Sequence, residues 1–115
     1  MEPLTLAAAL FLAAFEPISI PDDQKPRVVV MTDIGGDPDD QQSMVRFLLY
    51  SCDFRVEGIT TGFGFGHYRQ TRPDLVRRAI QAYAKVYPNL LEHRSDYPSP
   101  QYLPVSYTHL TLPTN

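Results

Sequence analysis

Four aspartates gather within eight residues of the sequence, namely Asp33, Asp37, Asp39 and Asp40. Neighbouring carboxylates repel one another, so such a cluster usually implies a bound cation, a shared proton or a helix N-terminus. Ca²⁺ takes roughly 6 to 8 oxygen ligands from carboxylates, carbonyls and water. We therefore expect a site for a hard metal ion. The structural alternative is that Asp39 and Asp40 only cap a helix, while the other two only make Asx turns.

The segments on either side of the acids must hold them in place. Three consecutive valines, Val28–Val30, predict a strand buried on both faces, as in a parallel sheet, with Asp33 at its carboxyl end. Open α/β sheets bind ligands at this edge. Gly35 and Gly36 allow positive φ or a close approach to another group, and Pro38 fixes its own φ, so we expect a shaped loop.

A helix is expected to follow the acids, and a second strand to follow that helix. Asp39 suits the N-cap position, and Gln42 three residues later completes a capping box. Apolar residues then recur at helical spacing on one face, at Met44, Val45, Leu48 and Leu49. After a turn at residues 51–53, Phe54 to Thr61 predicts a strand from the alternation of its side chains.

A second helix is expected after residue 71. Thr71 suits its N-cap, Pro73 its first turn and Pro88 its end. Because the formal net charge is -3 and the pI is about 5.5, we interpret the basic residues of this helix as a solvated face and expect no nucleic-acid partner. The strand-helix-strand-helix order predicts an α/β fold, the start of a doubly wound parallel sheet.

The motif from Thr32 to Ser43 resembles the N-terminal nucleoside-hydrolase-like domain of bacterial proteins described as cellulose-binding. That family is related to the inosine-uridine nucleoside hydrolases. The resemblance reaches to about Leu103, through the segments Val45–Ser51, Glu57–Ile59, Arg72–Leu75 and Tyr83–Leu91. It implies a parallel α/β fold of the nucleoside-hydrolase type.

The resemblance also implies roles for three of the acids. Asp33 would help to bind Ca²⁺ and act as the general base on the metal-bound water. Asp39 would contact ribose hydroxyls, and Asp40 would bind Ca²⁺. Two residues depart from the nucleoside hydrolases, since Met31 replaces a further Asp and Phe65 lies near the place of a ribose-binding Asn. We therefore expect metal binding to be kept more firmly than nucleoside specificity.

Three functions compete at this stage. The first is Ca²⁺-dependent hydrolysis of an N-glycosidic or related glycosyl bond, in which the cation lowers the pKa of water and a carboxylate takes the proton. Its substrate would be a nucleoside or another glycoside. The second is a non-catalytic module that binds a polysaccharide such as cellulose. The third is an Mg²⁺ phosphohydrolase, but Gly35 stands where that chemistry usually needs a second acid.

The first 24 residues are expected to be a leader or a signal peptide. The apolar run Leu4–Phe15 has the length of the apolar part of a secretory signal and is shorter than the roughly 20 residues that span a bilayer, so no stable membrane insertion is expected. This run favours export to the periplasm or the extracellular space. The alternative is a cytoplasmic leader, because Glu2 has the wrong sign and no basic residue precedes Lys25.

The other end of the chain is unusual. Residues 105–115 resemble the translation of a sequencing adapter, so we expect the native sequence to end near Pro104. The alternative is an ordinary C-terminal strand. Residues 25–104 would then form only the N-terminal part of the domain, too short for the whole sheet. On this hypothesis the chain as written neither binds metal tightly nor turns over substrate. Cys52, the only cysteine, is expected to be a structural thiol.

Overall fold

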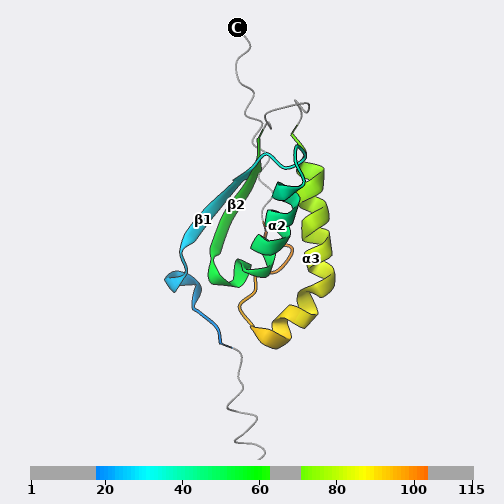
Figure 1. Cartoon of the computed structure of the whole chain (residues 1–115). Coiled ribbons are helices and arrows are strands. Elements are labelled where there is room, and N and C mark those ends of the chain that lie inside the picture. The colour runs from blue at the N-terminus through cyan, green and yellow to red at the C-terminus, as the bar shows by residue number, and fades with distance from the viewer. Residues whose placement is uncertain (1–17, 63–70, 104–115) are drawn as a thin grey trace, which may run out of the picture.

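The computed structural model describes residues 18–62 and 71–103 and arranges them in β-α-β-α order (Figure 1). This order, with parallel strands, confirms the predicted α/β class. The apolar run of the leader, Phe65 and the tail at 105–115 lie outside the described residues. The elements are η1 (Asp22–Gln24), β1 (Arg27–Thr32), α2 (Asp39–Leu49), η2 (Ser51–Asp53), β2 (Arg55–Thr61) and α3 (Pro73–His93).

The two strands pair in parallel and end together. Their register runs from Arg27 opposite Arg55 to Thr32 opposite Thr61, with an irregularity after Val28 that leaves Glu57 as an extra residue in β2. The ladder continues one step further, since the N–H of residue 62 donates to the carbonyl of Thr32 at 2.8 Å. The residues that follow the two strands therefore lie at the same edge of the sheet.

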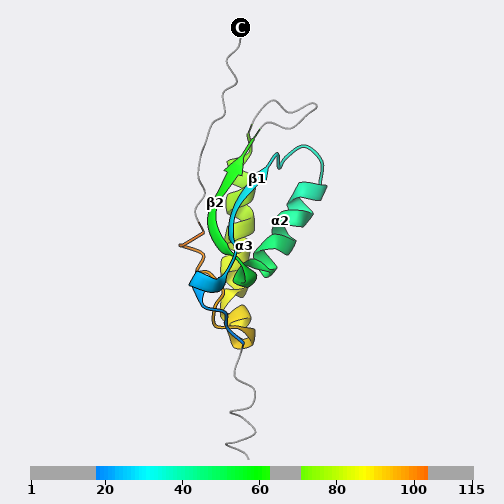
Figure 2. The same cartoon turned by 90° about the vertical axis from the view of Figure 1, so that its left-hand side faces the viewer.

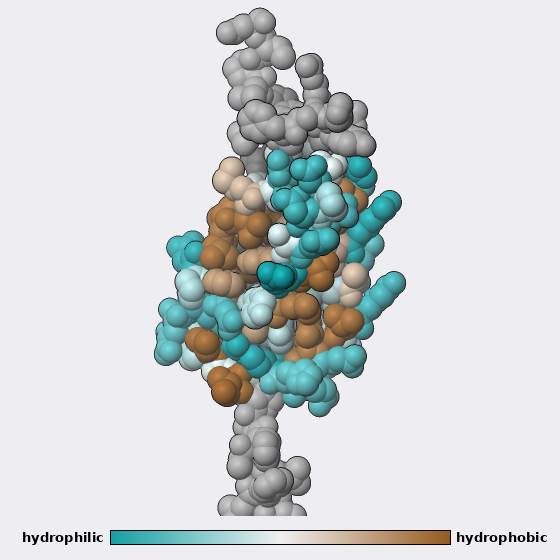
Figure 3. Space-filling view, viewed as in Figure 1, coloured by the Kyte–Doolittle hydropathy of each residue, from teal (hydrophilic) through white to brown (hydrophobic). Residues whose placement is uncertain are grey.

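The hydrophobic core lies between the strands and the two helices. Figure 1 shows α2 and α3 beside one another, next to the sheet. Hydrophobic surface remains over the strands beside α2 and between the two helices (Figure 3). The predicted face of α2 is only half buried, because Val45 and Leu49 are 54% and 45% exposed. The core consists of Ile34, Met44, Leu48, Val56, Ile59, Val76, Ile80, Tyr83 and Leu103.

The prediction that β1 is buried on both faces is wrong within the described part of the chain. Val28 and Val30 pack against the core, whereas Val29 and Met31 are 61% and 75% exposed. Side chains alternate across a strand, so these last two point away from the face that packs against the core. The second strand is buried more evenly, and Figure 2 shows the segment after α3 on the side of β2 opposite α2.

Both predicted N-caps are displaced by one residue. Pro38, not Asp39, occupies the N-cap position of α2, and no side chain caps the helix, so the capping box with Gln42 does not form. Asp39 is the first residue of that helix. Arg72, not Thr71, precedes α3, while the prediction of a proline in its first turn is confirmed.

The prediction that Pro88 ends the second helix is also wrong. The helix α3 continues through Pro88 to His93 and bends in its later part (Figure 1). A proline inside a helix removes one N–H donor and crowds the preceding turn, which favours a bend. Tyr87 and Leu90 flank Pro88 and pack against the core. We infer that this packing offsets the local cost of the proline.

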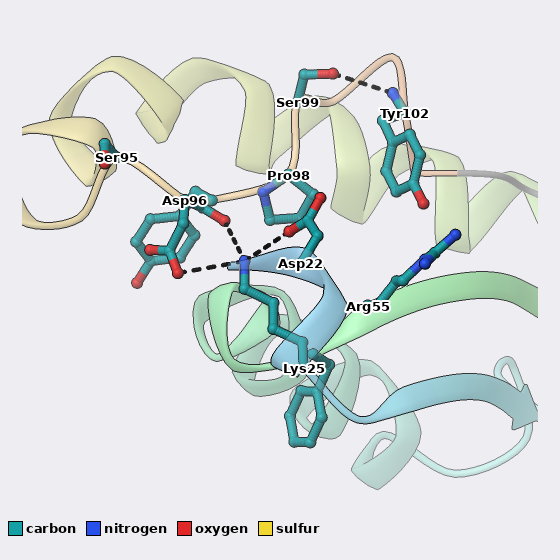
Figure 4. A pocket seen from close by; sticks show the side chains of 10 residues that line it. Asp22, Lys25, Arg55, Ser95, Asp96, Pro98, Ser99 and Tyr102 are labelled. Carbon is teal, nitrogen blue, oxygen red and sulfur yellow. Dashed lines mark hydrogen bonds and ion pairs between the residues drawn. The ribbon is translucent and has the colours of Figure 1, made fainter. Parts of the chain in front are cut away.

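An ionic network centred on the buried Asp96 closes the end of the sheet where the strands begin, and Figure 4 shows its contacts between Lys25 and Asp96. The side chain of Asp96 is 8% exposed and pairs with Lys25 at 3.2 Å and with Arg94 at 2.8 Å. Arg94 also reaches Asp53 at 2.6 Å, and the N–H of Ile20 donates to Asp96 at 3.0 Å. We call Lys25, Asp53, Arg94 and Asp96 the Asp96 network.

The network keeps the Asp96 carboxyl ionised. Burial alone would raise its pKa, but hydrogen bonds from Arg94, from the Ile20 N–H and from Lys25 hold that pKa well below its usual range. The hydrogen bonds to Asp96 raise the pKa of Arg94 in turn. The network therefore ties the start of the described chain to the segment that follows α3.

Candidate functional site

The predicted site acids lie at the edge where both strands end. Asp33 follows β1 and is exposed, while Asp39 and Asp40 open α2. Both helices begin at this end of the sheet (Figure 1). The N-terminus of a helix carries partial positive charge, so α2 favours carboxylates in its first turn. The fourth acid, Asp37, is exposed in the connecting loop.

Thr32 fixes the position of the Asp40 carboxylate. The Thr32 hydroxyl donates to Asp40 Oδ2 at 2.6 Å and accepts from the N–H of Ile34 at 3.1 Å. The side chain of Ile34 is buried in the core, so the turn after β1 is anchored there. The hydrogen bond from Thr32 lowers the pKa of Asp40. This carboxylate is therefore held in place in its ionised form.

Asp33 lies beside Asp40, and its pKa is shifted in the opposite direction. Its side-chain hydrogen bond with Asp40, together with the negative charge of Asp40, raises the pKa of Asp33. The charge of Asp39 adds to this effect. We call Asp33 and Asp40 the carboxylate pair. Two carboxyl groups in such contact are stabilised either by a proton on Asp33 or by a cation between them.

A glycine in the left-handed region shapes the loop between these acids. Gly35 has φ +111, and a Cβ atom built on it would lie 2.7 Å from Cγ of Arg72. The predicted shaped loop is thus confirmed at Gly35, by both its φ and its close contact. At Gly36 a Cβ atom would meet nothing within 4 Å. The loop therefore packs against the start of α3 through one glycine only.

We predict that Gly35→Ala destabilises the chain by about 1 to 3 kcal/mol, because the substitution adds backbone strain and a clash with Arg72. Urea unfolding followed by circular dichroism measures the change. Gly36→Ala is the matched control and should shift the free energy of unfolding by less than about 1 kcal/mol. Equal effects at both positions would show that the loop is not held through Gly35.

A shallow pocket beside the carboxylate pair has room for a small polar group. Its volume is about 260 Å³. The oxygen donors at this edge are hard ligands of the kind that Ca²⁺ and Mg²⁺ prefer. In the segments 18–62 and 71–103, no three His, Cys, Asp or Glu side chains are arranged to hold a metal ion. The pocket is lined by Met31, Thr32, Asp33, Thr60, Thr61 and Gly62.

The carboxylate pair fits part of a Ca²⁺ site. Asp33 and Asp40 would supply carboxylate oxygens, and the rest of a sphere of roughly 6 to 8 oxygens would come from carbonyls, water or ligand hydroxyls. The raised pKa of Asp33 means that ionising it beside Asp40 is unfavourable unless positive charge is added. A divalent cation would add that charge.

Sequence reasoning missed the part that Thr32 plays. Thr32 is the last residue of β1, and its hydroxyl reaches Asp40 in the first turn of α2, eight residues later. No local pattern in the sequence joins these two residues. Met31 lines the pocket together with Asp33.

None of the helices in the described residues has both the length and the apolar character that a membrane span requires. A comparison with models of protein families matches residues 27–109 to the family described as "Cellulose-binding Sde182, nucleoside hydrolase-like domain". This range contains β1, α2, β2, α3 and all four acids. Comparisons with curated proteins and with solved structures gave no match.

Proposed function

The chain belongs to the family of the nucleoside hydrolase-like domain of cellulose-binding Sde182, and we propose that its carboxylate pair serves in Ca²⁺-dependent hydrolysis of glycosyl bonds. The substrate would be a nucleoside or another glycoside. One observation carries the proposal: Asp33, with a raised pKa, lies beside an Asp40 that Thr32 holds ionised. This contact occurs at the edge where α/β sheets bind their ligands.

The two carboxyl groups suit different tasks. Asp40 is fixed by Thr32 and stays ionised, so it suits a metal ligand. Asp33 is exposed and holds a proton more readily, so it suits the general base that takes a proton from the attacking water. When bound, Ca²⁺ would lower the pKa of a water ligand and orient sugar hydroxyls. Asp39 lies close enough to influence Asp33 and is free to accept hydrogen bonds from a sugar.

The test is the release of reducing sugar from nucleosides and from neutral glycosides by a purified protein that carries the whole nucleoside hydrolase-like domain. We expect release in millimolar Ca²⁺ and none after chelation. Calorimetric titration with Ca²⁺ should give saturable binding that Asp40→Asn weakens. Release that is indifferent to chelation would contradict the role of the metal. Absence of both release and Ca²⁺ binding would contradict the proposal as a whole.

A second candidate is a domain on the same fold that binds carbohydrate without cleaving it. The description of the family as cellulose-binding favours it. So does the arrangement of the acids, since no three His, Cys, Asp or Glu side chains in the described residues are placed together to hold a metal ion. Retention of the protein on cellulose, without any release of sugar from soluble or insoluble glycosides, would favour this candidate over the hydrolase.

A further inference from the structure

We propose that a second pocket, at the end of the sheet where the strands begin, binds a neutral saccharide. It has a volume of about 340 Å³, within the range of about 300 to 1,000 Å³ for small-molecule sites. Lys25 lies just before β1 and Arg55 opens β2, so this pocket is at the opposite end of the sheet from the carboxylate pair. The segment 95–102 forms its other side. This inference does not depend on hydrolysis at Asp33.

The charges around the pocket favour a neutral ligand. Lys25 is 2% exposed at its side chain, and its ammonium is shared by Asp22 at 3.0 Å, by the Asp96 carboxylate at 3.2 Å and by the Asp96 carbonyl at 3.2 Å. Figure 4 shows these three contacts converging on the ammonium. An anion entering the pocket would meet two carboxylates and a cation already engaged. Of the charged side chains in the lining, Lys25 and Arg55 are basic and Asp22 and Asp96 are acidic.

The walls combine flat apolar surface with hydrogen-bonding groups. Tyr102 is 50% exposed, and its backbone N–H donates to the carbonyl and the hydroxyl of Ser99 at 3.0 and 3.2 Å. Figure 4 places Tyr102 and Pro98 on one side and Arg55 and Asp22 on the other. A pyranose has apolar faces and a rim of hydroxyls. An aromatic ring can cover such a face, while carboxylate and guanidinium groups bind the rim.

The groups that face the pocket are partly free for a ligand. Asp22 is 81% exposed at its side chain, and one of its oxygens bonds Lys25. Arg55 is 45% exposed at its side chain and pairs with Glu57 through its Nε at 3.0 Å. Both therefore retain polar atoms directed to solvent. A sugar ring with hydroxyls on its rim, such as a glucose unit of a glucan, suits the volume of the pocket, its balanced charges and its polar walls.

The test is calorimetric titration of the protein with neutral, soluble gluco-oligosaccharides. We expect saturable binding that Tyr102→Ala weakens about 10-fold, the loss of about 1.4 kcal/mol that removal of an aromatic contact implies. Tyr50→Ala is the matched control, because Tyr50 is 58% exposed and does not line this pocket. Arg55→Gln provides a second variant that keeps the size of the side chain, and it should also weaken binding about 10-fold.

Asp33→Asn separates this proposal from the proposed hydrolase. If the two sites are independent, Asp33→Asn leaves oligosaccharide affinity unchanged. A carboxymethylated glucan of similar length should bind more weakly than the neutral one. No saturable binding, a larger loss in Tyr50→Ala than in Tyr102→Ala, or tighter binding of the anionic polymer would each overturn the assignment.

Discussion

Asp96→Asn is expected to lower the free energy of unfolding by about 3 to 5 kcal/mol. Asp96 is the only carboxylate that pairs with both Lys25 and Arg94 in the described residues, and its side chain is 8% exposed. Without its charge, Lys25 would be left 2% exposed with one ionic partner, the exposed Asp22, and with the backbone carbonyl of residue 96. A domain of this kind is typically stable by only about 5 to 15 kcal/mol, so the loss should be large in urea unfolding at pH 7.

The pH dependence of this loss identifies its cause. The pKa of Asp96 is lowered in the folded state, so its contribution is fully present above the unfolded pKa and disappears as pH falls through the folded value. The difference between wild type and Asp96→Asn should therefore shrink on acidification below about pH 4. A loss that stays constant with pH would point to packing, not charge.

Asp74→Asn is the matched control for Asp96→Asn. Asp74 also pairs with an arginine, since Arg72 donates to it at 2.8 and 2.9 Å, and these hydrogen bonds lower its pKa to about 2. However, its side chain is 42% exposed, where solvent screens the pair. We expect a loss below about 1 kcal/mol. A comparable loss of unfolding free energy in both variants would show that the Asp96 network stabilises the fold no more than an exposed ion pair does.

Asp33→Asn is expected to reduce Ca²⁺-dependent release of sugar about 10²- to 10⁴-fold, the usual contribution of a general base. Asn keeps the shape of the side chain but cannot take a proton from water. The steady-state rate of a protein that carries the whole domain, in saturating Ca²⁺, measures the effect. Asp37→Asn is the matched control in the same loop, and it should keep the activity of the wild type. A similar loss in both variants would assign the effect to the loop and not to Asp33.

The same variant has a second readout that does not depend on activity. Because the neighbouring Asp40 raises the pKa of Asp33, the ionised Asp33 opposes folding as pH rises, so its removal should slightly stabilise the metal-free chain. In a protein that carries the whole domain, added Ca²⁺ should raise the melting temperature of the wild type more than that of Asp33→Asn. If Asp33 only made a turn, the variant would be less stable with or without Ca²⁺.

Patterns that act over a few residues were predicted well. The positive φ at Gly35 and the proline in the first turn of α3 follow from local backbone preferences, and the parallel pairing of the strands follows from the helix that connects them. The sequence predicted Asp40 as a metal ligand but not its hydrogen bond with Thr32, because capping rules consider only neighbours within one helical turn. Its partner Thr32 lies eight residues earlier and reaches it only once β1 and α2 are side by side.

Features that depend on distant packing were not predicted. Three valines describe a strand but do not say which faces other elements cover, so the exposure of Val29 was missed. Pro88 is a strong local signal for a helix end, yet the residues around it pack against the core and α3 continues. Asp96 lies 71 residues from Lys25, and no local pattern joins them.

The buried position of Cys52 gives the chain an internal reporter of local opening. Cys52 is 4% exposed, burial raises the pKa of its thiol, and its carbonyl accepts a hydrogen bond from Arg94 at 3.3 Å. The thiolate is the form that attacks alkylating reagents, so modification requires local opening that exposes Cys52 and separates it from Arg94. Since the sequence has one cysteine, the rate of labelling follows a single position. Mass spectrometry of the labelled chain would thus measure the rate of local opening at this end of the molecule.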